Sequence, residues 1–215
     1  MKRNADGTVA KRDAAATKER ITKAALAEFG TKGYGGARMA TIAKKARCNI
    51  RMLYHYFSGK QQLYLACLER VYTNIREAER ALNLLELEPE EAIRQLVDVT
   101  FSHMAENRDF VQIAGVENTL RGRFLKNVAP VPSAALDHIE TIRKILACGQ
   151  ERGIFREDID ALQLYVSILA LSYLHLSNQY TLSITYGTDL GDAAWLRDRR
   201  THVREMVTAY VKRSA

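Results

Sequence analysis

The segment from Arg38 to Phe57 constrains the fold most strongly, because its apolar residues repeat at helical spacing in two short blocks. The first block places one apolar face on Met39, Ile42, Ala43 and Ala46. The second block repeats that face with Ile50, Leu53, Tyr54 and Phe57. Between the blocks stands Asn49, whose side chain can cap a helix by accepting a hydrogen bond from a free N–H two or three residues on. The pattern predicts a helix-turn-helix, whose second helix can enter the major groove of DNA.

The basic residues of the chain are concentrated in its first quarter. Residues 1–60 hold 14 lysines and arginines against 4 acidic residues, whereas residues 61–215 hold 18 against 21. The net charge of +7 therefore comes from the N-terminal segment, and a concentrated positive region is what the neutralisation of DNA phosphates requires. Two alternatives stay open: an ordinary helix pair within a small bundle, and a solvated basic face without a partner.

Residues 17–66 carry a composite pattern of many positions at fixed spacing. Its members are Ile21, Ala24, Ala25, Leu26 and Phe29, then Gly33-Tyr34, Ile42-Ala43, Leu53 to Phe57, Lys60 and Leu63. In these positions the segment resembles the DNA-binding domain of the tetracycline-repressor (TetR) family of bacterial transcription regulators. The rest of the chain resembles that family only in its length and its helical pattern.

The segment departs from the family pattern at three places. The family's turn usually reads Ala-Gly-Val-Ser, with a glycine that is free to take a positive φ, but this chain has Ala46-Arg47-Cys48-Asn49. Arg47 is therefore expected to strain the turn or to shift its geometry. The usual Lys-Gly-Thr opening of the recognition helix is replaced by Ile50-Arg51-Met52, and the usual capping threonine of the preceding helix is Ala37. The resemblance consequently implies no particular operator sequence.

The chain is predicted to be all-α, because it has three prolines and few alternating β-branched runs. We expect a flexible arm over residues 1–15, a three-helix DNA-binding domain over 16–62 and a larger helical domain over 63–215. The resemblance implies that the larger domain binds an effector and dimerises. Outside the helix-turn-helix, the first helix of the chain is predicted near 16–32. The helices that follow are predicted near 60–84, 89–105, 108–121, 133–152, 160–184 and 194–212.

The sequence favours a cytoplasmic protein. No apolar signal segment follows the N-terminus, and the longest apolar stretch, around Tyr165 to Leu176, is too short to span a bilayer. A bacterial DNA-binding protein of this kind is expected at the nucleoid. The three cysteines, Cys48, Cys67 and Cys148, are far apart and are expected to be reduced, with a redox role for Cys48 as an alternative.

No constellation of residues indicates catalysis, a metal site or a cofactor. The five histidines are scattered, without a His-Glu-x-x-His motif or a carboxylate pair at helical spacing, and no Gly-x-Ser-x-Gly elbow occurs. We therefore expect no enzyme. A lone histidine in an apolar helix, such as His175, is more often a core residue than a catalyst.

The resemblance implies a homodimeric, ligand-responsive transcriptional regulator, expected to be a repressor that a small molecule releases from palindromic double-stranded operator DNA. Two recognition helices fit successive major grooves when they lie about 34–36 Å apart, and a ligand would favour another separation. The alternative is a constitutive dimeric DNA-binding protein, or an activator, without a small-molecule effector.

The expected DNA contacts fall into two groups. Residues on or beside the recognition helix are Asn49, Arg51, Met52, Tyr54, His55 and Tyr56. Residues expected to contact phosphates are Arg38, Lys44, Lys45, Arg47 and Lys60. For Tyr54 and Tyr56, packing beneath the helix is an equally open alternative.

The resemblance places the subunit contact on the last long helices, where two apolar stripes occur. One stripe consists of Leu136, Ile139, Ile142, Ile145 and Leu146, and the other of Leu162, Val166, Leu169 and Tyr173. The alternative is that these stripes face the core of their own subunit.

The effector site is implied within the second domain, between the long linking helix and the helices that follow it. Candidate lining residues are Tyr72, Ile75, Phe101, Met104, Phe110, Ile113, Glu117, Asn118, Arg121, Tyr165, Tyr173, His175 and Asn178. Ile113, Glu117 and Arg121 are expected to share one helical face, where the two charged groups could orient a polar ligand. The alternatives are a solvated intrahelical Glu117–Arg121 pair and a polar patch at the dimer contact.

Overall fold

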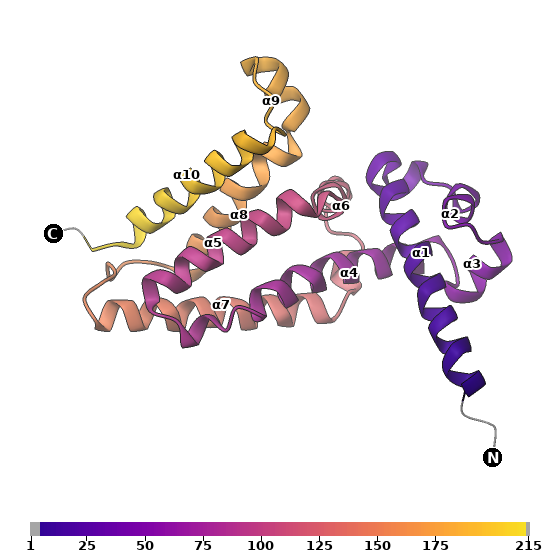
Figure 1. Cartoon of the computed structure of the whole chain (residues 1–215), viewed down its shortest axis with the longest axis horizontal. Coiled ribbons are helices and arrows are strands. Elements are labelled where there is room, and N and C mark those ends of the chain that lie inside the picture. The colour runs from indigo at the N-terminus through magenta and orange to yellow at the C-terminus, as the bar shows by residue number, and fades with distance from the viewer. Residues whose placement is uncertain (1–4, 214–215) are drawn as a thin grey trace. The chain divides into compact units, whose positions relative to one another are not determined.

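The structure is a computed structural model that describes residues 5–213, with the side chains of residues 5–13 and of residue 130 left aside. The described residues form ten α-helices, two short 3-10 helices and no sheet, which confirms the all-α prediction (Figure 1). In chain order the elements are α1 (Ala5–Gly36), α2 (Met39–Lys45), α3 (Ile50–Tyr56), α4 (Lys60–Arg80), η1 (Leu84–Glu86), α5 (Pro89–Glu106), α6 (Arg108–Thr119), η2 (Leu125–Asn127), α7 (Pro130–Glu151), α8 (Ala161–Ser177), α9 (Gln179–Tyr186) and α10 (Ala193–Val211).

The helix boundaries differ from the predicted ones in two informative places. Residues 1–4 of the predicted arm lie outside the described part of the chain, and the remainder of that arm is helical because α1 begins at Ala5. The helix predicted over 160–184 is interrupted at Asn178, so that α8 and α9 are separate helices. No helix in the described part of the chain is long and apolar enough to cross a membrane.

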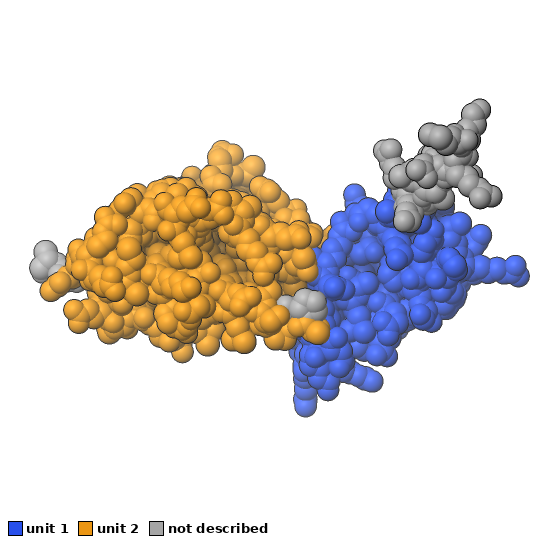
Figure 2. All heavy atoms as spheres, turned by 90° about the horizontal axis from the view of Figure 1, so that it is seen from below, with its two compact units in different colours: residues 1–71, 112–128 blue, residues 72–111, 129–215 orange. Residues whose placement is uncertain are grey.

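The chain divides into two compact units (Figure 2). Unit 1 combines residues 1–71 with 112–128, and unit 2 combines residues 72–111 with 129–215. The predicted boundary after residue 62 is therefore displaced. Leu63, Tyr64 and Leu68 of α4 are fully buried, and this burial is why the start of α4 belongs to unit 1 with the helix-turn-helix.

The core of unit 1 is apolar and partly aromatic. Phe29 of α1 meets Tyr64 of α4 edge to face, with ring centroids 4.9 Å apart. Phe124, from the segment 112–128, contacts the rings of Tyr34 and Tyr64 at 4.5 and 5.2 Å. Aromatic pairs at these distances add to the stabilisation that burial provides. The segment 112–128 is thereby built into the same core as the first helices.

The core of unit 2 is formed by α5, α7, α8 and α10. Ile93, Leu96 and Val97 of α5 are fully buried, as are Ile142 of α7 and Ile168 of α8. These residues recur at helical spacing, which is why each helix presents one apolar stripe to the others.

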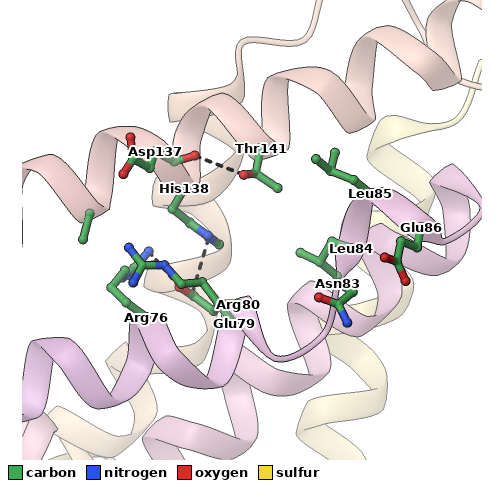
Figure 3. A pocket seen from close by; sticks show the side chains of 11 residues that line it. Arg76, Glu79, Arg80, Asn83, Leu84, Leu85, Glu86, Asp137, His138 and Thr141 are labelled. Atoms are coloured by element: carbon green, nitrogen blue, oxygen red, sulfur yellow. Dashed lines mark hydrogen bonds and ion pairs between the residues drawn. The ribbon is translucent and has the colours of Figure 1, made fainter.

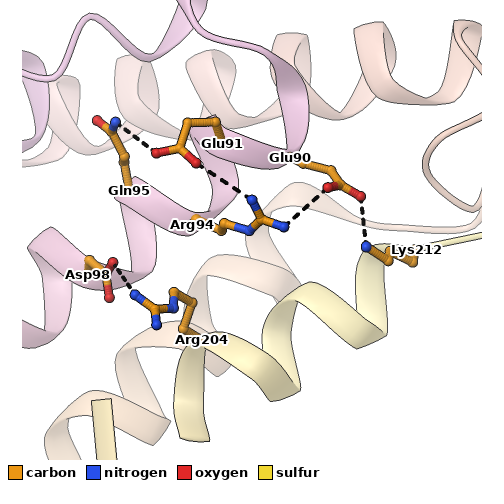
Figure 4. Close-up of polar contacts among 7 residues, drawn as sticks. All are labelled: Glu90, Glu91, Arg94, Gln95, Asp98, Arg204 and Lys212. Atoms are coloured by element: carbon orange, nitrogen blue, oxygen red, sulfur yellow. Dashed lines mark hydrogen bonds and ion pairs between the residues drawn. The ribbon is translucent and has the colours of Figure 1, made fainter. Parts of the chain in front are cut away.

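Polar contacts on the surface of unit 2 join α10 to α5 (Figure 4). Arg204 donates to Asp98 at 3.0 Å, and Lys212 lies 2.9 Å from Glu90, which also pairs with Arg94 at 3.3 Å. Pairs that remain partly exposed contribute little to stability individually. They fix the position of α10 along α5 more than they strengthen the core.

Candidate DNA-binding face and ligand pocket

The turn between α2 and α3 has a defined hydrogen-bonded geometry. The N–H of Cys48 donates to Ala43 O at 3.0 Å and the N–H of Arg47 donates to Lys44 O at 3.1 Å. These two bonds form a Schellman motif, which places its C′ residue in the left-handed region. Arg47 occupies that position with a φ of 52°, so the chain keeps the conformation that glycine usually provides and carries its strain.

The predicted N-cap of the recognition helix is confirmed. The Oδ1 atom of Asn49 accepts a hydrogen bond from the N–H of Met52 at 2.7 Å. This bond satisfies one of the free amides at the start of α3. In the structure Asn49 therefore fixes where α3 begins, and its predicted contact with DNA stays a prediction.

Helix α3 is more exposed than its apolar repeat predicts. Leu53 is its only buried residue, whereas Ile50 is 42% and Tyr54 is 48% exposed. The prediction of an apolar face including Ile50 and Tyr54 is therefore wrong, and so is the alternative that Tyr54 packs beneath the helix. A helix of two turns that contacts a core through one residue leaves its other side chains in solvent. Arg51, Met52 and His55 are also exposed, and Tyr56 is half-buried.

The basic residues around α3 differ in how far their charges are already paired. Lys45 Nζ lies 2.7 Å from the buried carboxylate of Glu28, and this hydrogen bond lowers the pKa of Glu28. Lys60 Nζ donates to Gly35 O at 3.3 Å. Arg38, Lys44 and Arg47 are exposed. Because Lys45 and Lys60 already have partners within the chain, they are weaker candidates for phosphate contacts than the sequence predicts.

The alternative of a redox role for Cys48 has no support. Its side chain is half-buried, and burial raises the pKa of the Cys48 thiol. A reactive cysteine requires the opposite shift, because the thiolate is the nucleophile. No group of three or more metal-ligating side chains occurs within the part of the chain that the structure describes.

The predicted effector residues are divided between the two units. Ile113, Glu117, Asn118 and Arg121 belong to unit 1, whereas the other predicted residues belong to unit 2. Phe101, Met104 and Phe110 are buried in packed surroundings. The sequence pattern identified buried and aromatic positions but could not tell filled core from pocket lining.

Glu117 is a structural carboxylate. Its Oε1 atom accepts hydrogen bonds from the N–H groups of Phe124 and Leu125 at 2.6 and 2.9 Å, and its Oε2 atom accepts one from the Tyr64 hydroxyl at 3.1 Å. The side chain is 2% exposed, and Arg121 lies beyond the end of α6 with a φ of 57°. The prediction that Glu117 and Arg121 share a ligand-binding helical face is therefore wrong. The alternative of a solvated intrahelical Glu117–Arg121 pair is wrong as well.

The predicted residues of α8 and beyond have other roles. Tyr173 is half-buried and its hydroxyl donates to Val111 O at 3.2 Å. His175 is buried between the rings of Phe101 and Trp195, with centroids 5.1 and 5.3 Å away. Burial lowers the pKa of His175 to about 4, so the imidazole is neutral. The interpretation of His175 as a core residue is confirmed.

A pocket of about 310 Å³ opens between α4, η1 and α7 of unit 2 (Figure 3). Its lining consists of Arg76, Glu79, Arg80, Asn83, Leu84, Leu85, Glu86, Ala134, Asp137, His138 and Thr141. A second hollow of about 210 Å³ shares four of these residues and adds Tyr72, Thr73, Val131 and Ser133. Tyr72 is thus the only predicted effector residue in the described lining of either hollow.

A buried polar cluster forms one wall of this pocket. Glu79 lies 2.8 Å from Arg76, and its Oε1 atom accepts a hydrogen bond from the Tyr165 hydroxyl at 2.7 Å. Arg76 also donates to the Tyr165 hydroxyl at 2.5 Å. Burial raises the pKa of Glu79, with Arg76 opposing that shift. The cluster joins α4 to α8.

His138 of α7 faces the same cluster. Its Nε2 atom lies 3.5 Å from Glu79 Oε1, but burial, aided by Arg76 and Arg80, lowers the pKa of His138 to about 3. The contact therefore joins a neutral imidazole to a carboxylate and is not an ion pair. The predicted effector site does not include Arg76, Glu79, Arg80 or His138. The only signal in the sequence was the three- and four-residue spacing of Arg76, Glu79 and Arg80 on α4.

Each of the two predicted dimer stripes contains both exposed residues and residues that belong to the core. Leu136, Leu162 and Val166 are 71%, 54% and 50% exposed. Ile142, Ile145 and Leu146 are buried in the core of their own chain, and Ile139 and Leu169 pack against that core. The prediction that Ile142 lies at a subunit contact is therefore wrong, because the inner face of α7 already covers α5 and α8.

Comparisons with known proteins agree with these features. The family model for bacterial regulatory proteins of the tetR family matches residues 21–67, and the model for the tetracyclin repressor-like C-terminal domain matches residues 89–207. The chain is 32% identical to the HTH-type transcriptional repressor NicS of Pseudomonas putida, over 92% of this chain and 93% of that protein. It is 30% identical to the HTH-type transcriptional repressor SCO4008 of Streptomyces coelicolor, over 76% and 80% of the two chains.

A solved structure has the same fold. The ketosteroid transcriptional regulator KstR2 of Mycobacterium tuberculosis superposes with a TM-score of 0.71 at 16% identity, covering 92% of this chain and 95% of that one. The two family models together account for the helix-turn-helix of unit 1 and for most of unit 2. The chain belongs to the tetracycline-repressor family and is a DNA-binding transcriptional regulator.

Proposed function

We propose that the protein is a homodimeric repressor that a small molecule releases from a palindromic operator. The observation that carries this proposal is the exposure of α3, which leaves Arg51, Met52 and His55 free for base edges while Leu53 alone anchors the helix. The curated relatives NicS and SCO4008 are both named as transcriptional repressors, which supports the repressing sign.

Readout of DNA by α3 would combine polar and apolar contacts. A guanidinium such as that of Arg51 can bind the O6 and N7 atoms of guanine, and apolar side chains such as Met52 can contact the methyl group of thymine. Lys44 and Arg47, exposed on the end of α2 and the turn, would contact phosphates and position the helix.

Operator sequences selected from random DNA would test this assignment. Arg51→Ala should change the preferred sequence and cost about 1–3 kcal/mol on the selected site, whereas Lys44→Ala should weaken all sequences alike and flatten the salt dependence. Lys144→Ala is the matched control, because it removes an exposed lysine of α7 in unit 2, outside the helix-turn-helix. Binding that does not depend on salt, or an unchanged preference in Arg51→Ala, would contradict the proposal.

Dimerisation would use the exposed face of α8. Leu162, Val166 and Leu174 are each at least 50% exposed, at spacings that place them along one side of the helix. A symmetric dimer matches a palindromic operator because both have a two-fold axis. Of the predicted stripe on this helix we therefore keep Leu162 and Val166 and replace the inner residues Leu169 and Tyr173 by Leu174.

Sedimentation of Val166→Glu would test the dimer. The variant should be monomeric and should bind the operator weakly, because one recognition helix makes only half of the contacts. Met206→Glu on α10, which also exposes its apolar side chain, is the control and should stay dimeric. A dimeric Val166→Glu protein would place the contact elsewhere.

The effector would bind in the α4–α7 pocket. Arg76, which lines this pocket, is bonded to Tyr165 of α8, and Tyr165 is adjacent to Val166 in the chain. A ligand that displaces Arg76 would therefore act on the helix that we assign to the dimer. Operator affinity would fall by the ligand's differential affinity for the two states.

An operator–reporter strain screened with small molecules would test this step. Ala134→Phe should fill the pocket and prevent release while leaving repression intact. Ala147→Phe, at an exposed position on the same helix, should respond normally. Release that persists in Ala134→Phe would move the effector site, and repression that no compound relieves would favour a constitutive DNA-binding protein.

A further inference from the structure

The α4–α7 pocket contains an arginine whose charge is not paired. Arg80 lines both hollows, and its guanidinium forms no ion pair or hydrogen bond with the described residues. Arg76, one turn earlier on α4, is instead held by Glu79 and Tyr165. Arg80 therefore offers the pocket a guanidinium that is available to a ligand.

His138 supplies a second group for a ligand on the facing helix. Its side chain is 7% exposed, and its Nε2 atom has no hydrogen-bond partner among the described residues. Buried polar atoms are usually satisfied, so an atom of this kind facing a pocket has capacity for a bound molecule. Figure 3 shows His138 pointing from α7 toward the α4 side chains that include Arg76 and Arg80. A neutral imidazole there suits a polar, uncharged substituent such as a hydroxyl or a carbonyl.

The other lining residues limit the size and charge of the occupant. Leu84, Leu85 and Ala134 provide apolar surface, and a volume of about 310 Å³ is at the lower end for ligand pockets. The carboxylates of Glu86 and Asp137 also line this space. These acidic groups would repel a doubly charged phosphate more strongly than a singly charged carboxylate.

We infer that this pocket binds a small organic carboxylate, with its carboxylate group on Arg80, its apolar part on Leu84, Leu85 and Ala134, and a polar substituent at His138. A guanidinium can bind a carboxylate through two parallel hydrogen bonds, which fixes the orientation of the ligand. This inference rests on the proposed function, because it names the class of effector for the same pocket.

Probe pairs of similar shape, one a carboxylate and the other its neutral amide, test the inference on the full-length protein. Benzoate and benzamide form one pair, and hexanoate and hexanamide form the other. Binding is measured by thermal shift and by calorimetric titration. At least one carboxylate should bind about tenfold or more tightly than its amide, since a hydrogen bond to a charged group is worth that factor or more.

Two substitutions locate the effect. Arg80→Gln should weaken carboxylate binding about tenfold and bring it close to that of the amide. Arg94→Gln, which removes an arginine of unit 2 that lines neither hollow, should bind like the unchanged protein. Amides that bind as tightly as carboxylates, no binding of either pair, or an unaltered Arg80→Gln variant would each overturn the inference.

The reporter screen separates this failure from failure of the proposed function. If uncharged or cationic compounds release the operator and Ala134→Phe blocks that release, the pocket stands and the carboxylate class is wrong. If carboxylates bind through Arg80 but never release the operator, the inferred ligand class stands and the regulatory proposal fails.

Discussion

Replacing Glu117 by alanine should destabilise unit 1 severely, even though no ligand is involved. The carboxylate accepts three hydrogen bonds, and two of its donors, the Phe124 N–H and the Tyr64 hydroxyl, belong to buried residues. Removing the acceptor of a buried donor costs about 1–3 kcal/mol, so the two together amount to about 2–6 kcal/mol. The third donor, Leu125 N–H, is partly exposed and can bond to water instead.

The loss should be smaller in Glu117→Gln. The amide oxygen of glutamine can still accept from both backbone N–H groups, and only the charge and the ideal contact with Tyr64 are lost. We expect a cost of about 1–2 kcal/mol for this variant. Asn118→Ala, at the next position on α6 and exposed, is the matched control and should change the stability by less than about 0.5 kcal/mol.

Urea denaturation followed by circular dichroism gives the free energy of unfolding for each variant. Hydrogen exchange at the amides of Phe124 and Leu125 shows whether the loss is local, because these amides should lose protection first in Glu117→Ala. A Glu117→Ala protein within about 0.5 kcal/mol of the unchanged chain would refute the role of Glu117 as a buried acceptor.

Three further predictions concern the turn, a tight packing contact and pH. Arg47→Gly should raise the free energy of unfolding by about 0.5–1 kcal/mol, because the relief of left-handed strain at the φ of 52° exceeds the added freedom of the unfolded chain. Thermal denaturation measures this change, and a lower stability of Arg47→Gly would argue against strain at Arg47. Gly149→Ala should lower the stability by about 1–3 kcal/mol in the same assay, since the added Cβ would lie 2.1 Å from the buried ring of Phe155. The control Gly59→Ala places its Cβ where nothing lies within 4 Å and should be nearly neutral, so equal effects of the two substitutions would contradict this packing argument. Because burial lowers the pKa of His175 to about 4, the unfolded chain binds a proton at this residue before the folded chain does as the pH falls below 6.5. The free energy of unfolding should therefore drop by about 2 kcal/mol between pH 7 and 5 on account of His175, and this contribution should be absent in His175→Gln.

The helix-turn-helix could be predicted because its signals are local. The cap at Asn49 depends on atoms three residues away, and the two apolar blocks need only the period of a helix. The departure at Arg47 was also visible in the sequence, since the Schellman turn requires a left-handed residue whatever side chain occupies it. The family resemblance rests on the same short-range pattern and was confirmed by the comparisons.

The α4–α7 pocket could not be predicted in the same way. Arg80 and His138 lie 58 positions apart in the chain, and only the packing of α4 against α7 brings them to one space. Glu117 illustrates the converse error. Its spacing from Arg121 indicated a polar face, but the position of Phe124 after α6 turned the carboxylate into an internal acceptor.

By itself, the sequence determined the all-α class, the helix-turn-helix, the capped recognition helix and the basic character of the first sixty residues. Each of these follows from period, capping or charge within a short stretch of chain. The tertiary structure alone decided which apolar faces are covered: Tyr54 and Val166 are exposed, whereas Ile142 is buried. Periodicity shows that a helix has an apolar side, but whether that side meets core, solvent or another molecule depends on which distant segment packs against it.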